Sequence, residues 1–173
     1  MERIDARSEP GAPADTIATG FASLDRLLGG GIRRQDLVVL SGDVGSGKSS
    51  FALAIALRSA RAGTPVTYLS GEMSETRLME RALALEGRVP VDALRASELD
   101  DLSRSAVGAA AVRLRDLPLQ IRPLSGERFE EIGEALDTVP RRGLLLLDDL
   151  QMTASPVASG SSDERIAATV RAL

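Results

Sequence analysis

The sequence of 173 residues contains no cysteine, no histidine and no tryptophan, and it has one tyrosine and three phenylalanines. Without cysteine, a disulfide framework and a thiolate metal site are both excluded. Without histidine, the commonest metal ligand and the usual imidazole base are missing, so any acid–base chemistry falls to carboxylates. Because aromatic residues are scarce, the core has to be built from Leu, Val, Ile and Ala.

Long apolar runs are also missing. None approaches the roughly 18–20 residues of a membrane span, and no signal peptide is visible, so we expect a cytoplasmic protein without a membrane segment. The length and a hydrophobic content of 43% are those of one globular domain. The formal net charge of −4 gives no bulk electrostatic case for nucleic-acid binding, which leaves only DNA held locally in a channel.

Lysine is nearly absent too, because Lys48 is the only one among 21 basic residues. Lysine differs from arginine in carrying a compact point charge, so its use at one position of an arginine-rich chain indicates a specific need there. Lys48 lies in Gly42–Ser49, which reads G-D-V-G-S-G-K-S. The apolar run Leu37–Leu40 precedes this loop and a helical pattern follows it, which is the context of a P-loop.

A P-loop binds a triphosphate through backbone N–H groups at a helix N-terminus, and its glycines let the backbone turn close to the phosphates. Lys48 would reach the β- and γ-phosphates, and the Ser49 hydroxyl would bind Mg²⁺. The alternative is an ordinary Gly/Ser turn, which the matching flanks disfavour. The residues predicted to hold ATP are Gly42, Asp43, Val44, Gly45, Ser46, Gly47, Lys48, Ser49 and Ser50.

The rest of the chain alternates between strand and helix patterns. Residues 1–18 are predicted to be disordered and 19–173 to form one domain. Strands are expected at 37–41, 66–69, 118–122 and 144–147, and helices at 21–28, 50–61, 74–86, 91–95, 97–117, 129–136 and 163–173, with Ser74 and Ser97 as N-caps and a flexible loop at 151–162. This alternation predicts an α/β fold with a mostly parallel sheet and helices on both faces.

Ligands bind at the carboxyl ends of the strands in such sheets. Glu72 follows the second predicted strand, and Asp148, Asp149 and Gln151 follow the buried run of leucines. An aspartate holding Mg²⁺, a glutamate deprotonating water and an amide contacting the γ-phosphate would complete an ATP-hydrolysing site. The alternatives are helix-dipole preference for Glu72, turn chemistry for the two aspartates and a solvated loop position for Gln151. Side chains alternate along a strand, so only one of the two aspartates is expected to face the site.

Taken together, these segments resemble the RecA-type motor domain of the DnaB-family replicative helicases over about residues 19–173. The similar segments are Thr19-Gly20, Leu24-Asp25, the P-loop, Gly71-Glu72-Met73-Ser74, Glu86-Gly87 through Leu94-Arg95 and Asp148-Asp149-Leu150-Gln151. The resemblance implies a RecA-like P-loop NTPase with ATP and Mg²⁺ as cofactors. It also implies Glu72 as catalytic base beside Lys48, Asp148 as metal ligand and Gln151 as γ-phosphate sensor. The implied partners are single-stranded DNA and further copies in a homo-oligomeric ring, expected to be a hexamer.

Two other functions stay open. Gly29–Ile32 and Tyr68–Glu72 are as similar to the RadA/Sms and KaiC ATPases, which implies a recombination or regulatory ATPase. The third hypothesis is a nucleotide-binding fragment or inactive paralogue that acts through partners. No basic or aromatic residue lies between Gln151 and Arg165, so the region where the resembled family has DNA-binding loops offers neither phosphate-binding charge nor a stacking platform. The resembled fold also continues into a strand between 37–41 and 144–148 and an arginine finger. We therefore expect a fold truncated at the C-terminus, with inefficient hydrolysis by this chain alone.

Overall fold

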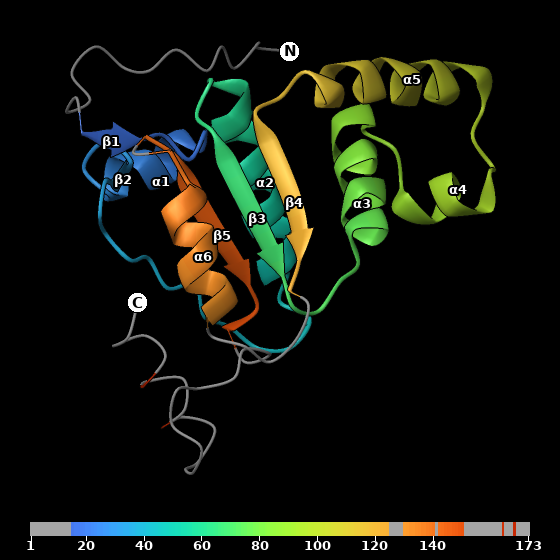
Figure 1. The fold of residues 1–173 in the computed structure, drawn as a ribbon. Helices are drawn as coiled ribbons and strands as arrows, with labels where there is room; N and C mark the ends of the chain where they lie inside the picture. Colours follow the sequence, from blue (N-terminus) through green and yellow to red (C-terminus); the bar gives the residue numbers. More distant parts are fainter. Residues whose placement is uncertain (1–14, 125–129, 141, 151–163, 165–167, 169–173) are drawn as a thin grey trace.

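A computed structural model describes residues 15–124, 130–140, 142–150, 164 and 168 of the chain (Figure 1). The elements in chain order are β1 (Thr16–Ile17), α1 (Ala22–Leu27), β2 (Ile32–Arg33), α2 (Lys48–Arg61), β3 (Val66–Ser70), α3 (Glu75–Gly87), α4 (Val91–Ala96), α5 (Asp101–Arg115), β4 (Leu119–Pro123), α6 (Glu130–Thr138) and β5 (Leu144–Asp148). The predicted loop 151–162 and helix 163–173 lie outside the described residues, apart from Glu164 and Ala168.

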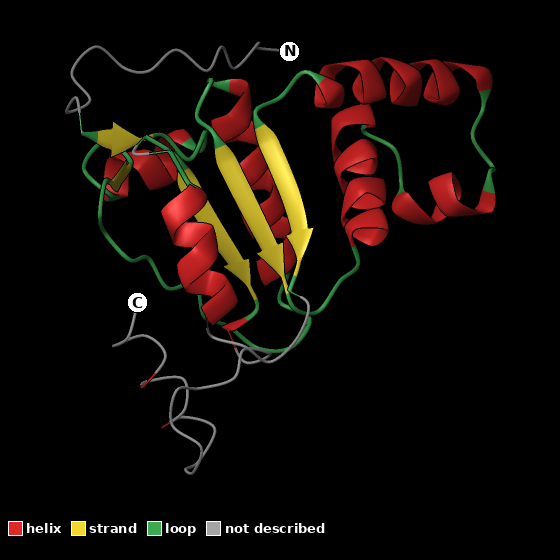
Figure 2. Cartoon of the chain, in the orientation of Figure 1, coloured by secondary structure: helices red, strands yellow, loops and turns green. Residues whose placement is uncertain are grey.

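The main sheet has three parallel strands in the order β4-β3-β5. Strand β3 is central, and its last residue, Ser70, is paired in register with Asp148 at the end of β5. Helix α2 covers one face of this sheet and α6 covers the other, as Figure 2 also shows. The predicted α/β fold with helices on both faces of a parallel sheet is therefore confirmed.

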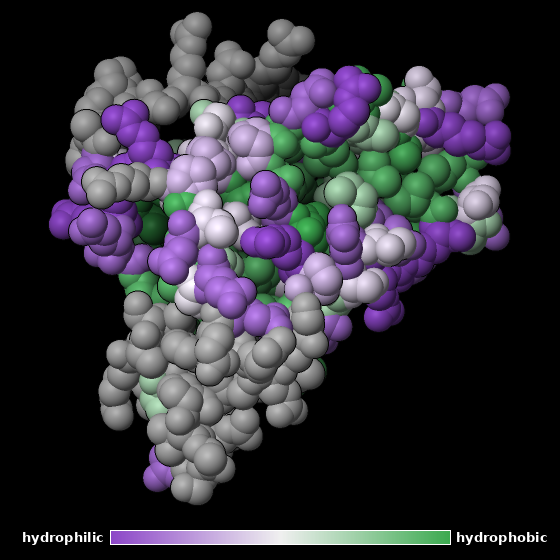
Figure 3. Space-filling view, in the orientation of Figure 1, coloured by the Kyte–Doolittle hydropathy of each residue, from purple (hydrophilic) through white to green (hydrophobic). Residues whose placement is uncertain are grey.

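The core lies between the sheet and helices α2 and α3. Leu53 and Leu57 of α2 pack with Tyr68 of β3 and Leu78 of α3, and all four side chains are buried. At the far end of α3 the packing against α5 is close, because a Cβ at Gly87 would lie 3.1 Å from Val107 Cγ2. Figure 3 shows hydrophobic residues between α3, α4 and α5, edged by hydrophilic ones. Within the described part of the chain, no helix is long and apolar enough to cross a membrane.

The ordered structure starts earlier than predicted. Thr16 and Ile17 form β1, which pairs antiparallel with β2, so the predicted disordered segment 1–18 is wrong at its C-terminal end. Asp25 Oδ1 accepts hydrogen bonds from both the backbone N–H and the hydroxyl of buried Thr19, at 2.8 and 2.7 Å. The Ser59 hydroxyl on α2 donates to Ala18 O at 2.8 Å, which ties this segment to the helix that follows the P-loop.

The predicted helix caps are correct in one case and wrong in the other. The Ser74 hydroxyl accepts from the backbone N–H of Arg77 at the start of α3, as predicted. Ser97 instead ends α4 in a left-handed conformation with a φ of 58°. The N-cap of α5 is Asp100, whose carboxylate accepts from Ser103 N at 2.7 Å. A carboxylate beside a helix N-terminus also interacts favourably with the helix dipole. The spacing of apolar residues, from which the helix start was predicted, contains no information on this interaction.

The strand predicted at 37–41 is not formed. Among the described residues, no backbone hydrogen bond involves Leu37–Ser41, and the side chains of Leu37–Leu40 are 47–60% exposed. An apolar, β-branched sequence favours a strand only where another strand pairs with it. Within the described part, no strand pairs with this segment, so it remains irregular despite its composition.

Strand β5 was expected to be fully buried, and this is also wrong. Leu144–Leu147 are half-buried and only Asp148 is buried. Among the described strands, β5 pairs with β3 alone and is an edge of the sheet. The two corrections have the same physical basis, which is missing strand pairing: in the described structure the segment 37–41 pairs with no strand, and β5 pairs with a strand on one side only.

The exposure of Leu37 can be tested by comparing the same leucine-to-alanine substitution at this exposed position and at a buried one. Leu53→Ala, at a fully buried position, should lower the free energy of unfolding by about 2–5 kcal/mol. Leu37→Ala, at a position 54% exposed, should cost less than about 1 kcal/mol because little apolar surface is lost from the core. Urea unfolding of both variants measures the difference. An equal cost would show that Leu37 is buried in solution, as in a paired strand.

Candidate nucleotide-binding site

The P-loop runs directly into α2. Lys48 is the first helical residue. The N-cap Gly47 has a φ of 93°, a backbone conformation that residues other than glycine rarely adopt. No side chain caps this helix, so its first backbone N–H groups are not bound by one. At Gly42, an added Cβ would lie 2.9 Å from Ser46 Oγ, so the loop closes tightly on itself. Within the described residues, the start of this helix is thus left without a side-chain cap, and the backbone donors of an uncapped helix N-terminus form a general anion site.

The ammonium of Lys48 lies over the loop. Its Nζ donates to the carbonyl oxygens of Gly42 and Asp43, both at 2.9 Å. Within the described residues it forms no ion pair with a carboxylate. The positive charge is therefore held at the loop by neutral acceptors, which an anion can replace.

Ser49, the next residue, contacts Asp148 across 99 positions of sequence. The Ser49 hydroxyl donates to Asp148 Oδ1 at 3.0 Å, and the Tyr68 hydroxyl donates to Asp148 Oδ2 at 2.8 Å. Asp148 is only 6% exposed, so both carboxylate oxygens depend on these donors. Burial raises the pKa of Tyr68 above its ordinary value, and the hydrogen bond to Asp148 raises it further, so the phenol stays protonated and donates.

Glu72 lies in the loop that follows β3. The backbone N–H of Gly71 donates to Asp148 O at 2.7 Å, and that of Met73 donates to Ser70 Oγ at 3.0 Å. These bonds fix the loop at the carboxyl edge of the sheet, beside the end of β5. The Glu72 side chain is exposed, and among the described residues no hydrogen bond or ion pair holds its carboxylate.

The oxygen donors at this edge suit a magnesium ion shared with a phosphate. Mg²⁺ is usually bound by one or two protein oxygens together with substrate phosphates and water. Ser49 and Asp148 supply one hydroxyl and one carboxylate at adjoining positions. Among the described residues, no group of three or more carboxylates exists that would form an all-protein site. The residues present therefore fit Mg²⁺ bound together with a nucleotide.

The structure brings together most of the predicted site residues. The P-loop residues and Asp148 meet at one edge of the sheet, with Glu72 in the adjoining loop. Asp149 is less buried than Asp148, and Gln151 lies outside the described residues.

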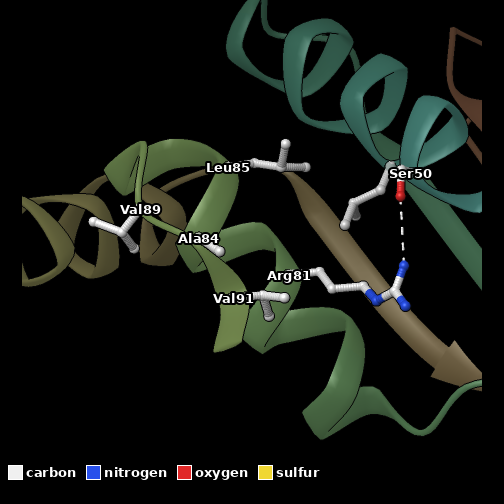
Figure 4. Close-up of a pocket in the computed structure, with 7 residues that line it drawn as sticks. Ser50, Arg81, Ala84, Leu85, Val89 and Val91 are labelled. Carbon is white, nitrogen blue, oxygen red and sulfur yellow. Dashed lines mark hydrogen bonds between the residues drawn. The ribbon is translucent and has the colours of Figure 1, made fainter. Parts of the chain in front are cut away.

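Two residues near the site were not singled out as site residues by the sequence. Tyr68 contacts Asp148, and Arg81 of α3 donates to Ser50 Oγ at 3.4 Å beside a shallow pocket between α2 and α3 (Figure 4). A signal for Tyr68 was available, because it is the only tyrosine and lies two residues before the end of a strand that leads to the site.

A P-loop at the start of a helix, facing an aspartate at the carboxyl end of a parallel strand, defines a P-loop NTPase fold. The structure is similar to a solved ATPase domain, with a TM-score of 0.80 and 20% identity, over 94% of this chain and 59% of that chain. It is also similar to a DnaB-like replicative helicase, from a study of that helicase's structure and its interactions with primase. The TM-score is 0.79 and the identity 20%, over 90% of this chain and 39% of that chain. Residues 16–173 match the family model of the DnaB-like helicase C-terminal domain, and the chain belongs to that family.

Curated relatives agree with this assignment. The chain is 29% identical over 156 residues to the replicative DNA helicase DnaB of Synechocystis, covering 87% of the chain and 17% of the relative. It is 31% identical over 140 residues to the replicative DNA helicase DnaC of Bacillus subtilis, covering 79% of the chain and 31% of the relative. It is also 45% identical over 88 residues to the DNA repair protein RadA of Mycolicibacterium smegmatis, covering 46% of the chain and 19% of the relative. The chain thus spans a minor part of each relative.

Replacing glycine by alanine is predicted to change the free energy of unfolding in opposite directions at Gly47 of the P-loop and at Gly108 of α5. An added Cβ meets no atom within 4 Å at either Gly47 or Gly108. Gly47→Ala should lower the free energy of unfolding by about 1–2 kcal/mol, because its φ of 93° is unfavourable for alanine. Gly108→Ala, inside α5, should raise it by about 0.5–1 kcal/mol. Denaturant titration tests both, and a neutral Gly47→Ala would contradict the loop conformation.

Proposed function

We propose that this chain is the ATP-binding and ATP-hydrolysing motor domain of a DnaB-type replicative helicase, which couples hydrolysis to movement on single-stranded DNA. The observation that carries this proposal is the contact between the P-loop Ser49 and the buried Asp148 at the carboxyl end of β5. Membership in the DnaB-like helicase C-terminal family supports it. Single-stranded DNA and a homo-oligomeric ring, expected to be a hexamer, belong to the same proposal.

In this function the free N–H groups at the start of α2 bind the phosphates. Lys48 moves from the carbonyl oxygens of Gly42 and Asp43 to the β- and γ-phosphate oxygens. Ser49 and Asp148 would hold Mg²⁺, which would supply positive charge to neutralise the charge that develops on the phosphates. Glu72, whose side chain is exposed, orients the attacking water and accepts its proton. Gln151 contacts the γ-phosphate in the same scheme.

A RadA-like recombination ATPase is the second candidate. The observation in its favour is the 45% identity to the RadA protein of Mycolicibacterium smegmatis over 88 residues. We expect ATPase stimulation by single-stranded DNA of both candidates, so that assay does not separate them. Unwinding of a forked DNA duplex is the assay that separates them in this proposal, since we expect it of the replicative helicase alone. A chain that hydrolyses ATP with DNA but leaves forks intact would favour the RadA-like function.

Lys48 gives the first test of nucleotide binding. Lys48→Ala should weaken the affinity for Mg²⁺-ATP by at least about tenfold, because a charge-assisted contact to two phosphates is lost. Arg61→Ala is the matched control, since it removes a positive charge from the other end of the same helix. A fluorescent ATP analogue measures both affinities, with circular dichroism as a check of folding. Equal affinities in the two variants would contradict phosphate binding by the P-loop.

Glu72 gives the test of hydrolysis, in a form of the protein that hydrolyses ATP. Glu72→Gln should keep the nucleotide affinity and lower kcat by about 10²–10⁴, because general-base catalysis contributes on that order. Glu75→Gln, in the first turn of α3 and also exposed, is the matched control and should keep most activity. Steady-state ATPase assays measure both. Normal turnover by Glu72→Gln would place the base elsewhere.

A further inference from the structure

Tyr68 reaches Asp148 because of the strand register. In the pairing of β3 with β5, Tyr68 is opposite Leu146 and Ser70 is opposite Asp148. Alternate residues of a strand share one face, so Tyr68 and Asp148 are diagonal neighbours on the same face of the sheet. A diagonal pair is too far apart for short side chains but within reach of an aromatic one. The hydroxyl closes the distance, with its oxygen 2.8 Å from Asp148 Oδ2.

Both partners of this contact are buried. Tyr68 is fully buried and packs with Leu53, Leu57 and Leu78, which fixes its ring. The ring packing needs no hydroxyl, because a phenylalanine of the same shape fills the same space. The specific contribution of the hydroxyl is therefore its hydrogen bond to Asp148 Oδ2. With Oδ2 bound, the carboxylate plane is fixed and Oδ1 is directed toward Ser49.

We propose that Tyr68 is a positioning residue of the metal–nucleotide site, and that its hydroxyl orients Asp148 so that Oδ1 is presented to the cation beside Ser49. This inference rests on the proposed function, because it assumes that Ser49 and Asp148 bind Mg²⁺ with a nucleotide. Partners that hydrogen-bond to a metal ligand orient it, and their loss lowers metal affinity by about 10–100-fold. Tyr68 therefore acts through Asp148 and does not contact the cation.

Tyr68→Phe is the direct test. The variant keeps the ring and removes the donor, so the Mg²⁺ concentration needed for half-maximal nucleotide binding should rise by about 10–100-fold. Saturating Mg²⁺ should then restore the wild-type nucleotide affinity. Nucleotide affinity measured with excess chelator should not change. A variant that is merely less stable would lose affinity at every Mg²⁺ concentration, and that result would overturn the proposal.

Two controls separate the possible causes. Thr67→Val removes a hydroxyl from the adjacent buried residue of the same strand, on the opposite face of the sheet, and should leave the Mg²⁺ dependence unchanged. In an Asp148→Asn background, Tyr68→Phe should add little further loss, because both changes act on one interaction. Additive losses would show that Tyr68 acts independently of Asp148. If the unaltered chain binds nucleotide without any dependence on Mg²⁺, the proposed function itself fails, and this inference fails with it.

A second measurement keeps the Tyr68 hydroxyl in place. Tyr68 is the only tyrosine, so biosynthetic incorporation of 3-fluorotyrosine places a single ¹⁹F label at this position. Nucleotide with Mg²⁺ should shift the ¹⁹F resonance more than the same nucleotide with chelator. This Mg²⁺-dependent shift should disappear in Asp148→Asn. The proposal would be overturned if the ¹⁹F chemical shift did not depend on Mg²⁺ while the nucleotide affinity did.

Discussion

The buried carboxylate of Asp148 joins the three elements that define the site. Its Oδ1 accepts from Ser49 at the start of α2, its Oδ2 accepts from Tyr68 of β3, and its backbone oxygen accepts from Gly71 in the loop that carries Glu72. Each of these bonds crosses between segments far apart in the sequence. Because Asp148 is only 6% exposed, its carboxylate cannot exchange these donors for water, and its three bonds link the start of α2, strand β3 and the loop that carries Glu72.

The parts of this site that follow from local sequence were predictable. Gly-Lys-Ser after an apolar run and before a helical pattern identified the P-loop, and leucines leading into Asp148 identified the acidic strand end. Both signals are short-range, because loop chemistry and strand alternation extend over a few residues only. The capping role of Ser74 was predictable for the same reason, since its partner is three residues away.

The errors arose where structure depends on partners distant in sequence. Leu37–Leu40 has an apolar, β-branched composition, yet strand formation needs a neighbour that composition does not specify. The leucines of β5 were expected to be buried on both faces, but burial depends on strand order, and β5 is an edge among the described strands. The contact of Tyr68 with Asp148 was missed because it requires the register of β3 on β5. Local pattern therefore predicted which residues lie together at this edge of the sheet better than it predicted the strands around them.

Charge explains why this arrangement suits a cation. The two donors to Asp148 are neutral hydroxyls, and among the described residues no arginine or lysine forms an ion pair with it. Hydrogen bonds satisfy the oxygens of a carboxylate but do not neutralise its charge. The ammonium of Lys48 is instead held by the carbonyl oxygens of Gly42 and Asp43, which phosphate oxygens can replace. Negative charge at the strand end and positive charge at the loop are thus kept apart without a ligand. In the proposed function a metal–phosphate ligand would complement both charges, with the metal beside Asp148 and the phosphates beside Lys48 and the N-terminus of α2.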